Sequence, residues 1–291
     1  MFEDFEQRRV ATSGAELNVM IGGDGPPLVL VHGFPQMHAM WHRIAPDLAQ
    51  EFTVVAPDMR GYGDSSKPPG GERSVAYSKR AMALDIVELM ASLGFDRFRY
   101  AGHDRGARVG YRLALDHPER VERMALLDIM PTLETFEAMD YRAALGAFHW
   151  LFLAQPHPLP ETLIAGDPNG FLHHLLGSWS GSDDSIFAPE AVAQYERCFA
   201  DPEAVRAMCD DYRAGATIDC EHDAAAREAG TRITCPLLIL WGEGRRNRRP
   251  VMMEVWENWA TNVEGRGLSC GHFLPEEAPE ETRDALLEFF R

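Results

Sequence analysis

The feature that most constrains the fold of this chain is an alternation of short apolar runs with longer stretches of helical periodicity. The expected strands lie in PPLVLVHG, FTVVAPD, RFRYAGHD, RMALLDIMP, CPLLILWG and RGLSCGH. Several are continuous and rich in β-branched residues, as is typical of strands buried on both faces. Most are separated by helical patterns such as YSKRAMALDIVELMASLGF. This alternation predicts an α/β fold with a mostly parallel sheet flanked by helices.

One long interval breaks the alternation. Residues 131–230 carry helical patterns and loops but no expected strand, and they fall between two core strands. We interpret them as a helical cap inserted into a core formed by residues 1–130 and 231–291. A chain of 291 residues with 45% hydrophobic content can bury such a core.

Composition narrows the classes of partner. The formal net charge of −17 argues against nucleic acid and against an anionic membrane surface. The sequence contains no run of about 18 apolar residues, so no membrane span is expected. The stretch MFEDFEQRR also lacks the apolar segment of a signal peptide. We therefore expect a cytoplasmic protein. The basic run GRRNRR directly follows an expected strand and is interpreted as a solvated loop.

The cysteines indicate neither a disulfide framework nor a metal site. Their number is odd, and they show no C-x-x-C or histidine-paired spacing. We expect reduced, structural thiols and a protein without a metal or another cofactor. The cysteines are Cys198, Cys209, Cys220, Cys235 and Cys270.

The stretch AGHDRGARVG, residues 101–110, places Asp104 where a sharp strand-to-helix turn is expected. Gly102 and Gly106 flank it in a small-x-nucleophile-x-small pattern, which is typical of a nucleophile elbow because neighbouring side chains would clash there. The alternative is a buried acid at an ordinary helix start, where the helix dipole favours a carboxylate.

A nucleophile of this kind needs a base and an acid. His272 lies in LSCGHFLPEEAPEE, on an expected loop after the last strand, and is the candidate base. Two carboxylates could hold its imidazole: Asp128 ends one strand and Glu243 follows another. We favour Asp128 because its strand neighbours the one that leads into the elbow.

Backbone N–H groups near the elbow could stabilise an oxyanion. Phe34 lies in VHGFP, in a glycine-containing loop after a strand, and its N–H is one candidate donor. The N–H of Arg105 is the other. A simple turn around Pro35 is the alternative interpretation of this loop.

Two arginines follow the proposed nucleophile on the same expected helix. Arg108 lies four residues beyond Asp104 and returns to nearly the same face, and Arg105 lies next to it. A planar guanidinium can bind a substrate carboxylate in a fixed geometry. The alternative is a pair of surface cations of little consequence.

Several motifs together resemble the α/β-hydrolase superfamily: HGFPQ, PDMRGYGDSSKP, GHDRGARVGYRLALDHP, LLDIMPT and SCGHFLPEEAPE. Within it, DRGARV together with FHW is similar to the fluoroacetate dehalogenases. The resemblance implies an Asp104 nucleophile, a His272 base, carboxylate-binding arginines and a homodimer. WGEGRRNRRP departs from the acid that related hydrolases carry there, which favours Asp128. The implied residues around the substrate are Arg105, Arg108, the halide donors His149, Trp150 and Tyr212, and a pocket-lining Trp179.

The chemistry is consistent with this resemblance. Displacing halide from an sp³ carbon needs an anion that attacks without first losing a proton, and a carboxylate is ready at neutral pH. His272 would then activate water against the resulting ester. The expected substrate is a small halogenated carboxylate, with fluoroacetate giving glycolate and fluoride.

Three alternatives remain open. An epoxide hydrolase would use the same acid and base but needs cap tyrosines to protonate the opening ring, and Tyr141, Tyr195 and Tyr212 are candidates. A noncatalytic binding protein of the same fold would need neither base nor acid. Finally, FHWLF could be an aromatic helix face that only packs in the core.

Overall fold

A computed structural model describes residues 1–181, 186–244 and 249–291, and its centre is one eight-stranded sheet. The strand order is β1-β2-β4-β3-β5-β6-β7-β8. From β4 to β8 every pairing is parallel, whereas β1, β2 and β4 pair antiparallel. The strands are β1 (Glu6–Ala11), β2 (Glu16–Gly22), β3 (Pro27–Val31), β4 (Thr53–Pro57), β5 (Phe98–His103), β6 (Val121–Leu127), β7 (Leu237–Gly242) and β8 (Val263–Leu268).

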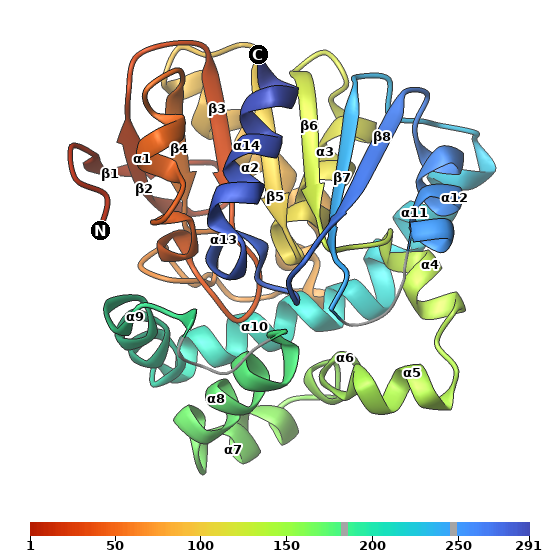
Figure 1. Ribbon diagram of the computed structural model, residues 1–291. Helices are drawn as coiled ribbons and strands as arrows, with labels where there is room; N and C mark the ends of the chain where they lie inside the picture. Colours follow the sequence, from red (N-terminus) through yellow and green to blue (C-terminus); the bar gives the residue numbers. More distant parts are fainter. Residues whose placement is uncertain (182–185, 245–248) are drawn as a thin grey trace.

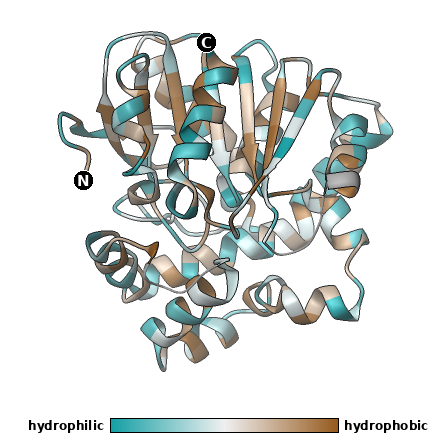
Figure 2. Ribbon diagram, viewed as in Figure 1, coloured by the Kyte–Doolittle hydropathy of each residue, from teal (hydrophilic) through white to brown (hydrophobic). Residues whose placement is uncertain are grey.

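The predicted, mostly parallel sheet is confirmed, and all six expected strands are present. Both faces of the sheet are buried. Because successive side chains of a strand point to opposite faces, one strand contributes to the hydrophobic clusters on both sides. Leu28 and Leu30 of β3 join one hydrophobic cluster, while Val29 and Val31 join another. Figure 2 shows hydrophobic colour along the central strands beneath helices of mixed hydropathy.

Helices cover each face of the sheet. On one side, α1 (Ala45–Leu48) and α14 (Pro279–Phe290) share a cluster with β3 and β4. On the other side, α2 (Lys79–Ser92), α3 (Arg105–Asp116) and α12 (Arg249–Trp259) contribute to the larger cluster. The short helices of the core are η1 (His38–Trp41), η2 (Glu72–Tyr77) and α13 (Leu274–Glu277).

Between β6 and β7, the described residues 128–181 and 186–236 form helices joined by loops, with one isolated β-bridge at Ile233 and no strand. Most of its helices form a separate layer below the sheet in Figure 1. The exact domain boundaries stay a prediction. The helices are α4 (Thr132–Glu137), α5 (Tyr141–Gly146), α6 (Phe148–Leu153), α7 (Leu159–Ala165), α8 (Pro168–Trp179), α9 (Pro189–Phe199), α10 (Pro202–Ala214), the π-helix η4 (Gly215–Asp219) and α11 (Cys220–Glu228).

Across the described ranges, the structure contains no helix with the length and hydrophobicity needed to cross a membrane.

Candidate active site

Asp104 occupies a sharp turn between β5 and α3. Its backbone has φ 45° and ψ −113°, a positive φ that non-glycine residues rarely adopt. Side chains would not fit beside it: a Cβ on Gly102 would lie 2.8 Å from the Ala107 nitrogen, and one on Gly106 would lie 2.3 Å from the His32 carbonyl oxygen. The two glycines are therefore required by close backbone packing, and the turn has the strained geometry expected of an elbow.

The His272 imidazole lies between two carboxylates. Its Nδ1 is 2.7 Å from Oδ2 of Asp128, and its Nε2 is 3.9 Å from Oδ2 of Asp104. Asp128 directly follows β6 and also accepts a hydrogen bond from the Gly242 N–H at 3.2 Å. Glu243, the other candidate acid, has an exposed side chain. The structure thus brings Asp104, His272 and Asp128 together.

The Asp104 carboxylate is also bound by the backbone. The Phe34 N–H donates to Oδ1 at 3.0 Å, and among the described residues the Arg105 N–H makes no such bond. Burial raises the pKa of the Asp104 carboxyl, but interactions with neighbouring imidazole and guanidinium groups outweigh this effect. The pKa of Asp104 therefore lies below its ordinary value, so the group is a carboxylate at neutral pH.

Arg105, predicted to bind a substrate carboxylate, is already paired with a carboxylate of the protein. Its guanidinium is fully buried, and Nε and Nη2 donate to the Asp211 carboxylate at 3.0 and 2.7 Å. The Tyr212 ring covers it with its centroid 4.2 Å from Cζ. Only Nη1 has no hydrogen-bond partner among the described residues. Most of the binding capacity of Arg105 is therefore already used inside the protein.

Arg108 differs from Arg105. Its Nη1 donates to the Met130 carbonyl at 2.8 Å and to Thr132 at 3.2 Å, and no carboxylate of the described residues lies within 4.0 Å of it. The Trp150 ring centroid is 4.4 Å from its Cζ. Burial lowers the pKa of Arg108, and the neighbouring charge of Arg105 lowers it further. This is a buried cation without a contacting counterion.

The four residues predicted to line the substrate site from residues 131–230 lie close together near Arg105, Arg108 and His272. They are His149, Trp150, Trp179 and Tyr212. His149 lies 4.3 Å from Trp179 and 5.8 Å from Tyr212, measured between ring centroids. Trp150 is 6.1 Å from Tyr212, and Trp179 is 5.6 Å from His272. Nδ1 of His149 is buried without a partner among the described residues. Burial lowers the pKa of His149 to about 3, so its ring is neutral at ordinary pH.

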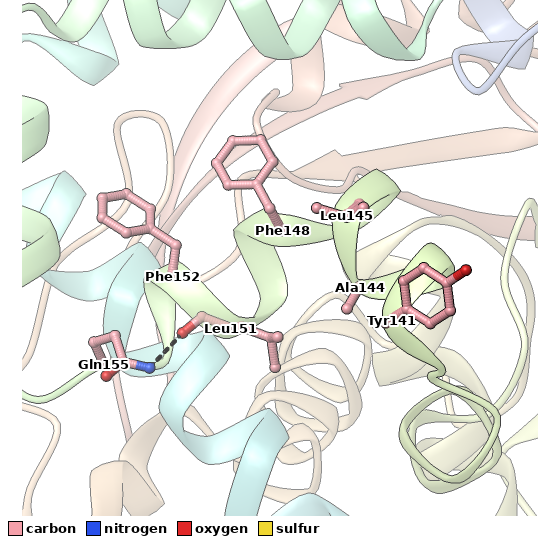
Figure 3. A pocket seen from close by; sticks show the side chains of 7 residues that line it. All are labelled: Tyr141, Ala144, Leu145, Phe148, Leu151, Phe152 and Gln155. Atoms are coloured by element: carbon pink, nitrogen blue, oxygen red, sulfur yellow. Dashed lines mark hydrogen bonds between the residues drawn. The ribbon is translucent and has the colours of Figure 1, made fainter.

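Helix α6 has one buried face and one exposed face, and the predicted site residues lie on the buried one. His149 and Trp150 are buried and face the core, whereas Phe148 and Leu151 are exposed. The exposed face lines an apolar pocket of about 560 Å³ together with residues of α5 (Figure 3). None of the residues predicted for the dehalogenase site lines that pocket, although Tyr141, a candidate of the epoxide alternative, does. His149 and Trp150 are thus the buried part of FHWLF, and Trp150 also packs in the main hydrophobic cluster, so the roles of both residues in a site stay predictions.

The tyrosines required by an epoxide hydrolase are dispersed. Tyr141 is 68% exposed on α5. Tyr195 is buried, and its hydroxyl lies 3.2 Å from the Glu276 carboxylate. Only Tyr212 lies beside the arginines and Phe34.

Some residues of the site were missed by sequence reasoning. His103 is buried, and its Nε2 lies 2.7 Å from the His272 carbonyl oxygen. Asp211 binds Arg105, and Glu277 binds the backbone around His272. The available signal for Asp211 was CDDY, which places two acids between apolar residues of the helix, because a buried carboxylate needs a cation.

Other predictions concern metals, thiols and the basic run. Within the described ranges no group of three or more histidine, cysteine or acidic side chains is arranged for a metal ion. All five cysteines are free thiols. Of the basic run predicted as a solvated loop, residues 245–248 lie outside the described residues, whereas Arg249 begins α12 instead of continuing the loop.

The chain belongs to the α/β-hydrolase family. Residues 26–279 match the model of the alpha/beta hydrolase fold. A fluoroacetate dehalogenase from Burkholderia sp. is 45% identical over 290 residues, which is 99% of this chain and 95% of that protein. The predicted resemblance to this family and to fluoroacetate dehalogenases is thereby confirmed, and it supports hydrolase activity.

Other relatives carry different names. A soluble epoxide hydrolase from Corynebacterium sp. strain C12 is 35% identical over 100% of this chain and 99% of its own length. A solved protein from Nostoc sp. PCC 7120 is 51% identical with a TM-score of 0.96, covering 100% of this chain and 99% of that one. The family therefore includes both reaction types that the sequence left open.

Proposed function

We propose that this hydrolase removes halide from haloacetates, converting fluoroacetate and water to glycolate, fluoride and a proton. In this proposal Asp104 is the nucleophile, His272 the base and Asp128 the acid that orients the imidazole. No metal or other cofactor takes part.

The observation that carries the proposal is the buried guanidinium of Arg108, which no carboxylate of the described residues contacts. A cation removed from water is costly unless an anion contacts it. Asp104 and Arg108 are one helical turn apart, so a carboxylate bound to Arg108 lies within reach of the nucleophile. A haloacetate carries that carboxylate one bond from the carbon to be attacked, whereas an epoxide brings no charge.

The first half-reaction forms an ester. One carboxylate oxygen of Asp104 attacks the halogen-bearing carbon, and the carbon–halogen bond breaks with its electron pair leaving on the halide. His149, Trp150 and Tyr212 carry the N–H and O–H donors nearest to this point. Among the described residues, no hydrogen bond occupies the Trp150 indole N–H or the Tyr212 hydroxyl. Both are available to a departing halide.

The second half-reaction hydrolyses that ester. His272 Nε2 accepts a proton from water while the water oxygen attacks the carboxyl carbon of Asp104. The Phe34 N–H, already 3.0 Å from Oδ1, stabilises the oxyanion, with the Arg105 N–H as the second proposed donor. The bond from that carbon to the glycolate oxygen then breaks, and the imidazolium returns its proton to the leaving oxygen.

Epoxide hydrolysis is the second candidate because a named epoxide hydrolase is also a relative. It would use the same Asp104 and His272. Of the three candidate tyrosines, however, only Tyr212 lies at the site, and the buried Arg108 would have no anionic group to bind.

Turnover of both substrate classes in parallel tests the proposal. Purified protein is incubated with fluoroacetate, with fluoride measured by electrode, and with propylene oxide, with the diol measured by chromatography. We expect fluoride release and little diol. Diol formation without fluoride release would replace the proposal by the epoxide reaction. If neither fluoride nor diol forms, the result would favour a noncatalytic protein.

A further inference from the structure

The side chain of Glu277, the last residue of α13, is bound by three backbone N–H groups. Oε2 accepts from Gly271 at 2.7 Å and from Gly181 at 2.7 Å, while Oε1 accepts from Phe273 at 2.8 Å. Gly271 and Phe273 are the two neighbours of His272 in the chain. One carboxylate therefore holds the backbone on both sides of the proposed base.

The third donor comes from the cap. Gly181 follows α8 by two residues, so Glu277 joins the loop of the base to the segment after Trp179. A second bond runs parallel to this one, because the His272 N–H donates to the Trp179 carbonyl at 3.0 Å. The two segments pack so tightly that a Cβ on Gly271 would lie 2.2 Å from the Gly181 nitrogen.

The arrangement suits a carboxylate and no neutral isostere. An ionised carboxylate only accepts hydrogen bonds and can receive several at once, and bonds to a charged acceptor are stronger than neutral ones. A carboxamide has a single acceptor oxygen. Its NH₂ group would have to face at least one of these backbone N–H donors and would leave that donor unpaired.

The imidazole depends on this loop for its place. His272 lies between β8 and α13, outside both elements, so no helix or strand fixes its backbone. Its Nε2 must stay on the side of Asp104, from which it is separated by 3.9 Å, while Nδ1 remains on Asp128 at 2.7 Å. A small rotation of the loop would move Nε2 away from the attacking water.

We propose that Glu277 is a positioning residue that holds His272 for ester hydrolysis and couples its loop to the cap. The inference rests on the proposed function. Only the second half-reaction uses the base, so loss of Glu277 has a specific signature. Ester formation continues while ester hydrolysis slows, roughly 10–100-fold for a misplacement of about 1 Å.

The test compares Glu277→Gln with Glu280→Gln, an exposed acid of α14 three residues further on. Each protein is mixed with excess bromoacetate or fluoroacetate, quenched in the first turnover and at steady state, and assayed for halide and for the mass of the Asp104 peptide. For Glu277→Gln we expect first-turnover halide release within about threefold of the wild type, a slowed steady state, and accumulated ester. Glu280→Gln should match the wild type.

Equal slowing of both half-reactions, or no slowing of either, would overturn the proposal. If circular dichroism shows that Glu277→Gln is not folded, Glu277→Asp replaces it, because aspartate keeps the charge on a shorter side chain. This variant must then show the same accumulated ester. Misfolding of both variants would assign Glu277 to stability alone and would equally overturn it. Failure of the proposed function is distinguishable, because neither halide nor ester would then form in the wild type or in His272→Ala.

Discussion

Asp211, on cap helix α10, binds the guanidinium of Arg105, the first residue of core helix α3, through two side-chain bonds of 2.7 and 3.0 Å. Lys79 also contacts the Asp211 carboxylate, and the Tyr62 hydroxyl donates to it at 2.6 Å. Burial raises the pKa of Asp211, but the two cations hold it well below the ordinary value. The charge of Arg105 is therefore balanced before any substrate arrives, whereas no carboxylate of the described residues contacts Arg108.

Asp211→Asn should destabilise the fold and weaken substrate binding. The change leaves Arg105 and Lys79 buried with less compensation, which typically costs about 3–5 kcal/mol. Released from Asp211, Arg105 would no longer be held beneath the Tyr212 ring, so KM for haloacetates should rise. Urea unfolding and steady-state kinetics measure the two effects. Glu203→Gln, exposed on the same helix, is the control, and an unchanged unfolding free energy in Asp211→Asn would contradict the interpretation.

Arg108→Lys should lower turnover of haloacetates although the positive charge is kept. A lysine ammonium is a point charge and cannot reproduce the planar, two-nitrogen contact of a guanidinium with a carboxylate. We expect kcat/KM to fall roughly 10–100-fold, the equivalent of one charged hydrogen bond. Arg142→Lys, on the exposed side of the cap, should have no effect. An unchanged kcat/KM in Arg108→Lys would remove Arg108 from the substrate site.

The central sheet could be predicted because its strands are buried on both faces and therefore leave continuous apolar runs. The first two strands could not. Glu6–Ala11 is an edge strand, nearly all exposed, and its sequence EQRRVA carries no apolar run. Edge strands of this kind are stabilised by pairing with their neighbour, a long-range property that a local pattern does not record.

The same distinction applies to the site. Asp104 and Asp128 each follow a strand of a parallel sheet and His272 follows another strand end, so topology alone brings them to one edge. Asp211 and Glu277 lie on helices, and their partners depend on how the cap rests on the core. The sequence places Arg105 directly after the proposed nucleophile. It could not show that the Asp211 carboxylate binds two of the three nitrogens of the Arg105 guanidinium. The predicted homodimer and cytoplasmic location stay predictions.

His272→Ala should stop the reaction at the ester. Alkylation of Asp104 needs no base, whereas water attack does, so halide release of about one equivalent per site should accompany a permanently modified Asp104 peptide. Mass spectrometry after incubation with a haloacetate measures this. An unmodified peptide despite one equivalent of halide would contradict the roles assigned to both residues.

Glu276 should give the protein a pH-dependent stability. Burial raises the pKa of Glu276 from 4.5 to about 8, and its carboxylate contacts Gln36 and Tyr195. Because the folded state favours the protonated form, its contribution is complete below about pH 4.5 and is lost as the pH rises toward 8, by at most about 1.4 kcal/mol per pH unit. Glu276→Gln stays neutral throughout. Its unfolding free energy relative to the wild type should therefore increase from pH 5 to 8, and a constant difference would refute the assignment.

Trp150→Phe should separate fluoride from bromide as leaving groups. Fluoride departs poorly but accepts hydrogen bonds strongly, so a donor placed where its charge develops is worth roughly 10²–10³ in rate, by analogy with oxyanion sites. Trp150 is buried over Arg108, with its ring centroid 4.4 Å from Cζ, and phenylalanine keeps most of that apolar volume while deleting the indole N–H. Turnover of fluoroacetate should fall far more than that of bromoacetate, measured on the same preparation. Phe148→Leu, on the exposed face of the same helix, should leave the ratio of the two rates unchanged. Equal losses on both substrates in Trp150→Phe would instead assign Trp150 to packing around Arg108, since a disturbed guanidinium weakens every haloacetate alike.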